Sequence, residues 1–325
     1  MKEVYFIIPE FDNSVTGGTL YDDNLVRELK KHHTLIKEVR VHYKINTILL
    51  HKKINKIPKR SDILIDGYLV NKIRMKLFNR LNILIHHPCS LEKSNNQMSD
   101  INLYLSERKA FNTAESLITV SKTMKKVLSK YLDRNKKICV AYPGIDKVFC
   151  KQEINKDSKN ILSVGNIIPR KGYHILIEAL RRVTKDWTLT IVGNYEIDKN
   201  YYDNLKRLII KNKMQDRIIF KGSMKPTEII AEIKKSRFFI LLTKYEGFGM
   251  SIAECAAAGL EIITTDLPVL REVLGDYPVD FVNLKDIENI SKRITQKLSR
   301  KLINTKNKDI IYTWSHTAKK IKQSL

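Results

Sequence analysis

The chain has 325 residues, of which 43% are hydrophobic and 29% charged, and it carries a net charge of +24. These values are typical of a globular protein with a sizeable core, and the length favours two domains. No stretch approaches the ~18 consecutive apolar residues of a membrane-spanning helix, and the charged first residues do not resemble a secretory signal, so we expect a cytoplasmic protein.

Short apolar, β-branched runs alternate along the chain with segments of helical periodicity. In the first half the predicted strands are Val4–Pro9, Ile63–Asp66, Asn82–His86, Leu117–Ser121 and Cys139–Pro143. In the second half they are Ile161–Gly165, Leu189–Gly193, Ile218–Lys221, Phe238–Leu242, Glu261–Thr265 and Val279–Val282. This alternation predicts an α/β fold in which parallel sheets have helices on both faces.

A polar segment without periodicity, residues 151–160, separates the two series of strands and indicates a linker. We therefore predict a first domain over residues 1–150 and a second over 151–312, each doubly wound and Rossmann-like. Such domains would face each other across a cleft at the carboxyl ends of their strands. Residues 313–325 predict a separate terminal helix.

The segment with the strongest chemical pattern, residues 245–259, directly follows a predicted strand and opens a helix. Gly247 and Gly249 allow a ligand to approach the backbone, and the start of a helix offers unpaired N–H groups to a diphosphate. Glu254 lies about one turn into the helix, and its side chain leans back towards the position that a ribose would occupy. The alternative is structural, since Ser251 and Glu254 have the spacing of a capping box.

A second segment places Arg170 and Lys171 at the start of the next predicted helix. Cations at that position oppose the helix dipole and cost ~0.3–1 kcal/mol each, so their presence favours an anion-binding site. The alternative is that they are two solvated surface cations of a very basic protein.

Two weaker signals lie in the first half. His86 and His87 end a predicted strand and would face opposite ways in extended backbone, so we expect one of them to reach a ligand. The alternatives are a metal site, for which we find no partners of suitable spacing, and a hydrogen-bonded structural histidine. Gly17 and Gly18 follow the first strand and could equally form a plain turn.

Two absent motifs narrow the chemistry. No Asp-x-Asp is present to hold a divalent metal against a diphosphate, and no G-x-x-x-x-G-K-[ST] indicates a phosphate-binding-loop NTPase. The four cysteines lack the spacing of a zinc site. We expect neither a metal nor another cofactor.

The chain resembles a known family at several of these motifs. Glu246 and Glu254, seven residues apart around Gly247-Phe248-Gly249, resemble the E-x7-E motif of the GT4 family of GT-B glycosyltransferases. Residues 165–172 resemble that family's phosphate-binding segment, although Asn166 stands where the family usually has arginine. The Gly17–Gly18 pair and the His86–His87 pair fall where the family has its glycine loop and its active-site histidine. The likeness covers nearly the whole chain and is strongest over residues 160–275.

The resemblance implies a GT-B fold, with the terminal helix crossing back to the first domain. It implies a retaining, metal-independent transfer of a hexose-type sugar from a UDP- or GDP-linked donor to a glycan, lipid-linked or protein acceptor. The implied catalytic residues are His86, Glu246 and Lys171. The implied donor-binding residues are Gly17, Gly18, Asn166, Arg170, Lys171, Gly247, Phe248, Gly249, Met250 and Glu254.

Particular roles follow from the same resemblance. Lys171, with Arg170, would neutralise the diphosphate, and Glu254 would hold the ribose hydroxyls. Glu246 would contact the donor sugar, and His86 would lie near its anomeric carbon. A GT-B-type nucleotide-sugar epimerase and a non-catalytic nucleotide-sugar-binding partner subunit are the alternatives within this fold.

The positive charge is spread along the chain, because residues 1–150 and 151–325 each carry +12. It is densest between Lys37 and Arg80. Nucleic acid, an anionic membrane surface and simple solubility are competing explanations. Since no nucleic-acid motif is present, we expect no nucleic-acid partner. The basic first domain predicts peripheral contact with anionic lipid at the inner membrane face.

Overall fold

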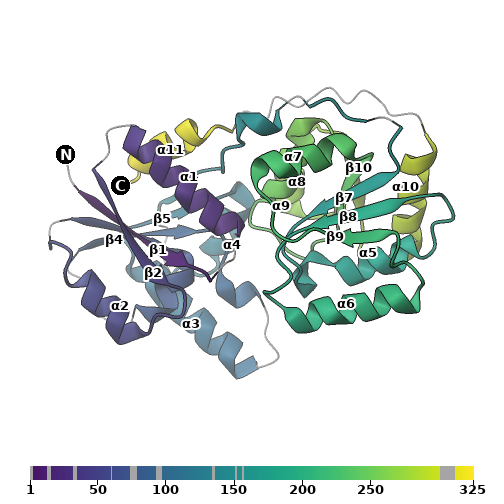
Figure 1. Ribbon diagram of the computed structural model, residues 1–325. Coiled ribbons are helices and arrows are strands. Elements are labelled where there is room, and N and C mark those ends of the chain that lie inside the picture. Colours follow the sequence, from purple (N-terminus) through teal and green to yellow (C-terminus); the bar gives the residue numbers. More distant parts are fainter. Residues whose placement is uncertain are drawn as a thin grey trace. The chain divides into compact units, whose positions relative to one another are not determined.

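Each of the two series of strands forms its own six-stranded parallel sheet. The computed structural model describes residues 3–12, 16–31, 35–59, 61–73, 79–92, 97–133, 136–150, 152–155, 157–300 and 312–325. The chain divides into two units: Met1–Gly144 together with Tyr312–Leu325, and Ile145–Ile311 (Figure 1). The predicted site residues all lie within the described ranges. Val15, which precedes the Gly17–Gly18 pair, and three basic residues of the stretch from Lys37 to Arg80 (Arg60, Arg74 and Lys76) lie outside them.

The sheet of the first unit has the order β2-β1-β3-β4-β5-β6. Its strands are β1 (Val4–Glu10), β2 (Ile36–His42), β3 (Asp62–Asp66), β4 (Arg80–Ile85), β5 (Ser116–Thr119) and β6 (Ile138–Val140). The central strands β3 and β4 are buried along almost their whole length, and their apolar residues, among them those at 63–65 and 83–85, fill both faces, as expected of a parallel sheet. Every neighbouring pair is parallel, with Ile7 opposite Ile65 in the central pair.

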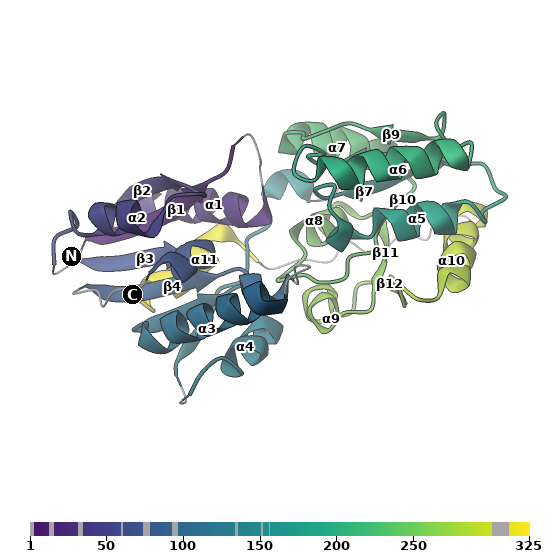
Figure 2. The same ribbon diagram turned by 90° about the horizontal axis from the view of Figure 1, so that it is seen from below.

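Helices cover both faces of this sheet. They are α1 (Gly17–Lys31), α2 (Thr47–Ile54), α3 (Gln97–Thr113), α4 (Lys122–Ser129) and α11 (Trp314–Lys322), with short 3₁₀ turns η1 (Gly67–Lys72) and η2 (Cys89–Leu91). Helices α1 and α11 lie side by side on one face, and α2 and α3 lie on the other (Figures 1 and 2). The last helix of the chain therefore completes the first unit.

The sheet of the second unit has the order β12-β11-β10-β7-β8-β9, and all its pairs are parallel. Its strands are β7 (Asn160–Val164), β8 (Thr188–Val192), β9 (Ile218–Phe220), β10 (Phe238–Leu241), β11 (Glu261–Thr265) and β12 (Val279–Val282). Its helices are α5 (Tyr173–Leu180), α6 (Lys199–Lys211), α7 (Pro226–Lys235), α8 (Met250–Ala258), α9 (Pro268–Leu274) and α10 (Ile287–Ser299), with 3₁₀ turns η3 (Lys147–Phe149) and η4 (Pro169–Lys171). Helices α5 and α6 lie on the opposite face from α7 and α8.

Each sheet has one point at which the strand order reverses. The chain leaves β1 towards β2 and then returns to β3 on the other side, and it leaves β7 towards β8 before returning to β10. Because crossovers between parallel strands are right-handed, this reversal puts successive helices on opposite faces. In such sheets ligands bind at the reversal point, beside the carboxyl ends of the strands.

Two features differ from the sequence expectations. Strand β2 was not predicted, because its polar and charged residues alternate with few apolar ones at the sheet edge. The predicted boundary lay after residue 150, whereas the second unit begins at Ile145. The segment expected to be a linker is attached to that unit, since the backbone N–H groups of Gln152 and Asn155 donate to Ala258 and Lys234.

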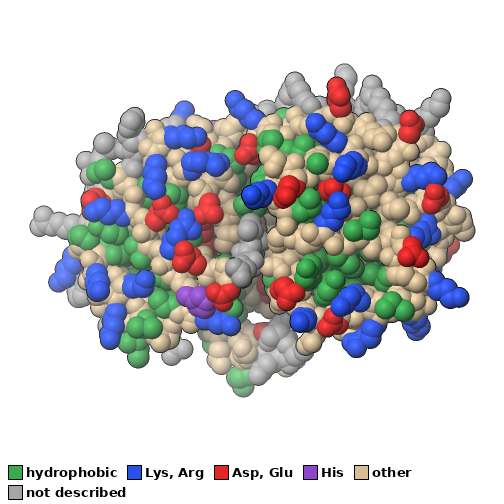
Figure 3. Space-filling model, viewed as in Figure 1, with side chains coloured by type: hydrophobic (Ala, Val, Ile, Leu, Met, Phe, Trp, Pro, Cys, Tyr) green, Lys and Arg blue, Asp and Glu red, His purple; other side chains and the backbone are tan. Residues whose placement is uncertain are grey.

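The surface agrees with a charge that is spread along the chain. Lysine and arginine side chains are distributed over the visible face of both units, interspersed with aspartate and glutamate (Figure 3). Among the described residues, none of the helices is both long enough and apolar enough to span a bilayer.

Candidate active site

In the second unit, the residues predicted to bind a diphosphate converge at the reversal point between β7 and β10. Lys171 ends η4, which follows β7, and Glu246 lies in the loop after β10. Lys171 Nζ is 2.6 Å from Glu246 Oε1, and a terminal nitrogen of Arg170 is 3.6 Å from Glu246 Oε2. The sequence places these residues 75 positions apart, and the pairing of β7 with β10 brings them together.

This ion pair is largely withdrawn from solvent. The Lys171 and Glu246 side chains are 12% and 9% exposed. Burial alone would raise the pKa of Glu246, but Lys171 and Arg170 hold that pKa below its ordinary value. The alternative of two solvated surface cations is therefore wrong for Lys171, which is a buried charge with a defined partner.

Backbone geometry fixes the two segments against each other. Gly172, between η4 and α5, has a φ of 71°, and a Cβ at this position would overlap the carbonyl oxygen of Leu242. The Arg170 guanidinium donates to the carbonyl of Tyr245 at 2.7 Å, and the Lys244 N–H donates to the Arg170 carbonyl at 2.8 Å. Only glycine at 172 permits this close approach without strain.

Helix α8 begins beside the ion pair without a side-chain cap. Its N-cap is Gly249, with a φ of 89°, and its first N–H groups have no capping side chain. The capping-box alternative is wrong: Ser251 lies inside the helix, and its hydroxyl donates to the carbonyl of Val164 at 2.9 Å. The helix ends at Gly259 in a left-handed conformation, as its sequence predicted.

Glu254 lies one turn further along α8 with its carboxyl unpaired. It is partly buried, and no hydrogen bond or ion pair reaches it from the described residues. Burial, with a smaller effect from the charge of Asp146, raises the pKa of Glu254 to about 8. A polar ligand that donates hydroxyl groups would supply the missing partners.

The remaining predicted residues of this unit line the same strand ends. Asn166 accepts the backbone N–H of Asn194 at 3.3 Å, which ties the loop after β7 to the loop after β8. Phe248 is buried and Met250, the first residue of α8, is partly exposed. Gly247 lies in the loop between Glu246 and the helix.

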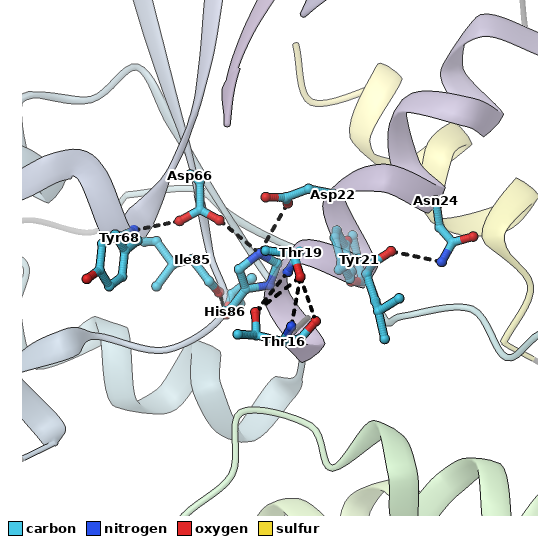
Figure 4. Close-up of polar contacts among 12 residues, drawn as sticks. Thr16, Thr19, Tyr21, Asp22, Asn24, Asp66, Tyr68, Ile85 and His86 are labelled. Atoms are coloured by element: carbon cyan, nitrogen blue, oxygen red, sulfur yellow. Dashed lines mark hydrogen bonds and ion pairs between the residues drawn. The ribbon is translucent and has the colours of Figure 1, made fainter. Parts of the chain in front are cut away.

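The first unit contains a second cluster, at the reversal point between β1 and β3. His86 follows β4, Asp66 ends β3, and Asp22 lies in the second turn of α1. His86 Nε2 is 3.2 Å from Asp22 Oδ1 and 3.2 Å from Asp66 Oδ2 (Figure 4). The His86 side chain is 17% exposed, whereas Asp22 is fully buried.

The three groups of this cluster shift one another's pKa. Burial alone would lower the pKa of His86, but the two carboxyls raise it to about 10. Burial and the neighbouring Asp66 raise the pKa of Asp22 well above its ordinary value. Burial opposes ionisation of Asp66 as well, yet the hydrogen bond and charge of His86 keep its pKa lowered. At neutral pH we therefore assign an imidazolium to His86.

The structure distinguishes the two histidines. His87 Nε2 contacts Glu92 Oε1 at 3.1 Å on the exposed side of the loop, whereas His86 points into the cluster. Both carboxyl partners of His86 escaped sequence analysis. Asp66 and His86 each stand at the carboxyl end of a predicted strand. This shared position could have identified Asp66 as a neighbour of His86.

The glycine pair belongs to α1 rather than to an open loop. Gly17 is the first residue of the helix, whose start is closed by Thr16 and Thr19. A Cβ on Gly18 would lie 3.1 Å from His86 Cδ2, so glycine at this position lets the imidazole pack directly on the helix. The contact of Gly17 and Gly18 with a phosphate stays a prediction.

Tyr21 connects this cluster to the last helix of the chain. Its ring meets the edges of His86 and Trp314 at centroid distances of 5.1 and 5.3 Å. Its hydroxyl donates to the carbonyl of Ala141 at 2.9 Å. Helix α11 therefore supports the wall against which His86 is held.

The same three groups are the set that could converge on a cation within the described residues. A cation would have to displace the proton from an imidazole whose pKa is raised by two carboxyls, and each of those carboxyls already contacts that nitrogen. We therefore assign the cluster as a hydrogen-bonded ion group.

Two Rossmann-like units of this kind form the GT-B fold of glycosyltransferases. Sucrose-phosphate synthase from Thermosynechococcus elongatus has the same fold, with a TM-score of 0.78 and 13% identity over 100% of this chain and 95% of that one. HepE of Anabaena, in complex with UDP-glucose, gives a TM-score of 0.74 and 16% identity over the whole of both chains.

Residues 145–313 match the family described as "Glycosyl transferases group 1", which is more than half of the chain, and the protein belongs to that family. An uncharacterised glycosyltransferase of Methanocaldococcus jannaschii is 29% identical over 51% of this chain and 44% of its own length. A GDP-mannose:cellobiosyl-diphosphopolyprenol alpha-mannosyltransferase of Xanthomonas campestris is 30% identical over 38% of this chain and 33% of its own. The chain spans less than half the length of these curated relatives.

Proposed function

We propose that the protein is a retaining, metal-independent glycosyltransferase that moves a hexose-type sugar from a UDP- or GDP-linked donor to a glycan, lipid-linked or protein acceptor. The observation that carries the proposal is the buried Lys171–Glu246 pair beside the uncapped start of α8. Positive charge and unpaired N–H groups together suit a diphosphate. The carboxyl of Glu254 lies one turn away and is free to accept ribose hydroxyls.

The proposed chemistry uses these charges on the leaving group. Cleavage of the glycosidic bond leaves additional negative charge on the nucleotide diphosphate. Lys171, Arg170 and the first N–H groups of α8 would stabilise that charge without reorganising, which replaces the role of a metal. Glu246 would hold Lys171 in place and contact the donor sugar, with Phe248 and Gly249 approaching through their backbone. The sugar would pass through an oxocarbenium-like state, and His86 is the proposed active-site histidine.

The relatives suggest donors and acceptors to try first. The name of the Xanthomonas campestris protein specifies a GDP-linked mannose donor and a diphosphopolyprenol-linked acceptor. The HepE structure holds UDP-glucose. Both molecules are sugars linked to a nucleoside diphosphate, and the diphosphate is the group that the Lys171 cluster is proposed to bind.

The proposal is tested by thermal shift with UDP, GDP, ADP and their common sugars, with and without EDTA. A ligand that binds only the folded protein at ~100 times its Kd stabilises it by ~2.7 kcal/mol. We expect a clear shift with one nucleotide that EDTA leaves unchanged. If no nucleotide raises Tm, the donor site assigned to Lys171 and Glu254 is wrong.

A matched control separates binding from stability. Lys297 forms a buried pair with Glu261 at 2.8 Å, at the amino end of β11 in the same sheet. Lys297→Met should lower Tm but keep the nucleotide-induced shift, whereas Lys171→Met should abolish the shift. Product analysis with donor alone and with acceptor then separates transfer from epimerisation, and absence of any turnover would favour a binding subunit.

We also propose peripheral contact of the first unit with anionic lipid. On α2, Ile48 is 68% exposed and Leu49 is exposed as well. Each lies one turn before an exposed lysine, Lys52 and Lys53, so apolar and basic groups share one helix surface. Co-sedimentation with phosphatidylserine vesicles should weaken in Ile48→Ser/Leu49→Ser. No binding to such vesicles at low salt would refute this contact.

A further inference from the structure

The imidazole of His86 is held by contacts from three directions. Nε2 is 3.2 Å from one oxygen of Asp22 and 3.2 Å from one oxygen of Asp66, which come from α1 and β3 (Figure 4). The ring packs on Gly18 and against the edge of Tyr21. A rotation of the ring that moved Nε2 away would break both carboxyl contacts. Asp22 and Asp66 would then be buried without this partner.

The carboxyls are themselves anchored. Asp66 Oδ1 accepts the backbone N–H of Tyr68 at 2.6 Å, so its other oxygen is directed to His86. Asp22 is fully buried, and its Oδ2 has no hydrogen-bond partner among the described residues. A buried carboxyl with an unpaired oxygen is costly, and the cost is tolerable when the group serves a positioning role.

We propose that Asp66 and Asp22 are positioning residues that keep Nε2–H of His86 directed into the domain, so that Nδ1–H is the group offered to substrate. This inference rests on the proposed function, in which His86 is the active-site histidine. Within the described residues no hydrogen bond reaches Nδ1.

The arrangement makes His86 a hydrogen-bond donor and excludes it as a general base. With both ring nitrogens protonated, the imidazolium can donate only to an oxygen, such as a sugar hydroxyl or a phosphate oxygen. The titratable groups that face it are Asp22 and Tyr21 from α1 and Asp66 from β3. The pKa of Tyr21 is raised by burial, so its phenol stays neutral and adds no charge.

The direct test is nitrogen NMR of the histidine side chains in the full-length protein. We expect His86 to show two protonated nitrogens from pH 6 to beyond pH 8. In Asp66→Asn its titration should move down towards ~6.5, the ordinary range of histidine. Glu92→Gln is the matched control, because it removes the carboxyl partner of the neighbouring His87 and should leave His86 unchanged.

Three results would overturn the proposal. They are a neutral His86 at pH 7.5 in the wild type, an unchanged His86 titration in Asp66→Asn, and a stoichiometric metal that is lost in that variant. If Asp66→Asn fails to fold, the wild-type spectrum still decides the protonation state. Asp22→Asn provides a second test. Asp22 contacts the same nitrogen, Nε2, as Asp66, so this variant should also lower the pKa of His86.

Turnover supplies a separate readout. In Asp66→Asn we expect kcat to fall by on the order of 10²-fold with donor KM little changed, and the loss to grow as pH rises above ~6.5. Asp66→Glu should recover part of the activity. If the spectra behave as expected but the wild type turns over no donor, the proposed function fails and the positioning role survives. A pH profile of Asp66→Asn parallel to that of the wild type would refute the role in catalysis.

Discussion

Nucleotide affinity should depend on pH through Glu254. Burial, with a smaller effect from the charge of Asp146, raises the pKa of this partly buried carboxyl to about 8. Two ribose hydroxyls donate better to a carboxylate than to a neutral acid. If only the carboxylate binds, about 9% of the protein is competent at pH 7 and about 90% at pH 9. The apparent Kd should therefore fall about tenfold over that interval.

The assay is calorimetric titration with the nucleotide diphosphate at several pH values, in two buffers that differ in ionisation enthalpy. Binding at pH 7 should release close to one proton, and the release should vanish above pH 9. We expect Glu254→Gln, which cannot titrate, to show neither the release nor the pH dependence, which would identify Glu254 rather than the diphosphate as the source of the proton. Equal pH dependence in the wild type and in Glu254→Gln would refute the assignment of this carboxyl to the ribose.

Three further perturbations have defined outcomes. Lys171→Ala should lower kcat by on the order of 10²–10³ and should also lower Tm, because only Arg170, at 3.6 Å, is then left to pair with the buried Glu246; an unchanged kcat would exclude Lys171 from the mechanism. Gly172→Ala should lower Tm far more than Gly222→Ala, since both have left-handed φ but only the first lacks room for a Cβ; equal losses in thermal unfolding would contradict this. Trp314→Ala should cost ~3–5 kcal/mol by denaturant unfolding, and a cost near zero would mean that α11 is dispensable.

The alternation of strands and helices was readable from sequence because buried parallel strands are continuous apolar runs. Strands β1 and β10 are examples, with nearly every residue buried. Strand β2 escaped because it forms the sheet edge, where charged residues such as Glu38 and Arg40 form ion pairs with each other at the surface. From the sequence alone, a segment as polar as β2 cannot be distinguished from a loop.

Only those parts of the site that have a local sequence pattern could be predicted from the sequence. Glycines beside a helix start and cations before one pointed to the segments around Glu246 and Lys171. Their direct pairing was not foreseen, because it depends on which strands are neighbours. The acids around His86 were missed for the same reason: Asp22 lies 64 residues away, on a helix that carries no recognisable motif at that position.

The return of the last residues to the first unit has a consequence for biosynthesis. The wall behind His86 includes Tyr21 and Trp314, and Trp314 leaves the ribosome only after the whole second unit. At ~5–20 residues per second, roughly 10–30 s separate the synthesis of Gly144 from that of α11. A nascent chain therefore carries an unfinished first unit while the second is already able to fold. Helix α11 must be synthesised before the histidine cluster can reach its final packing, so fragments that end before Trp314 would lack that packing.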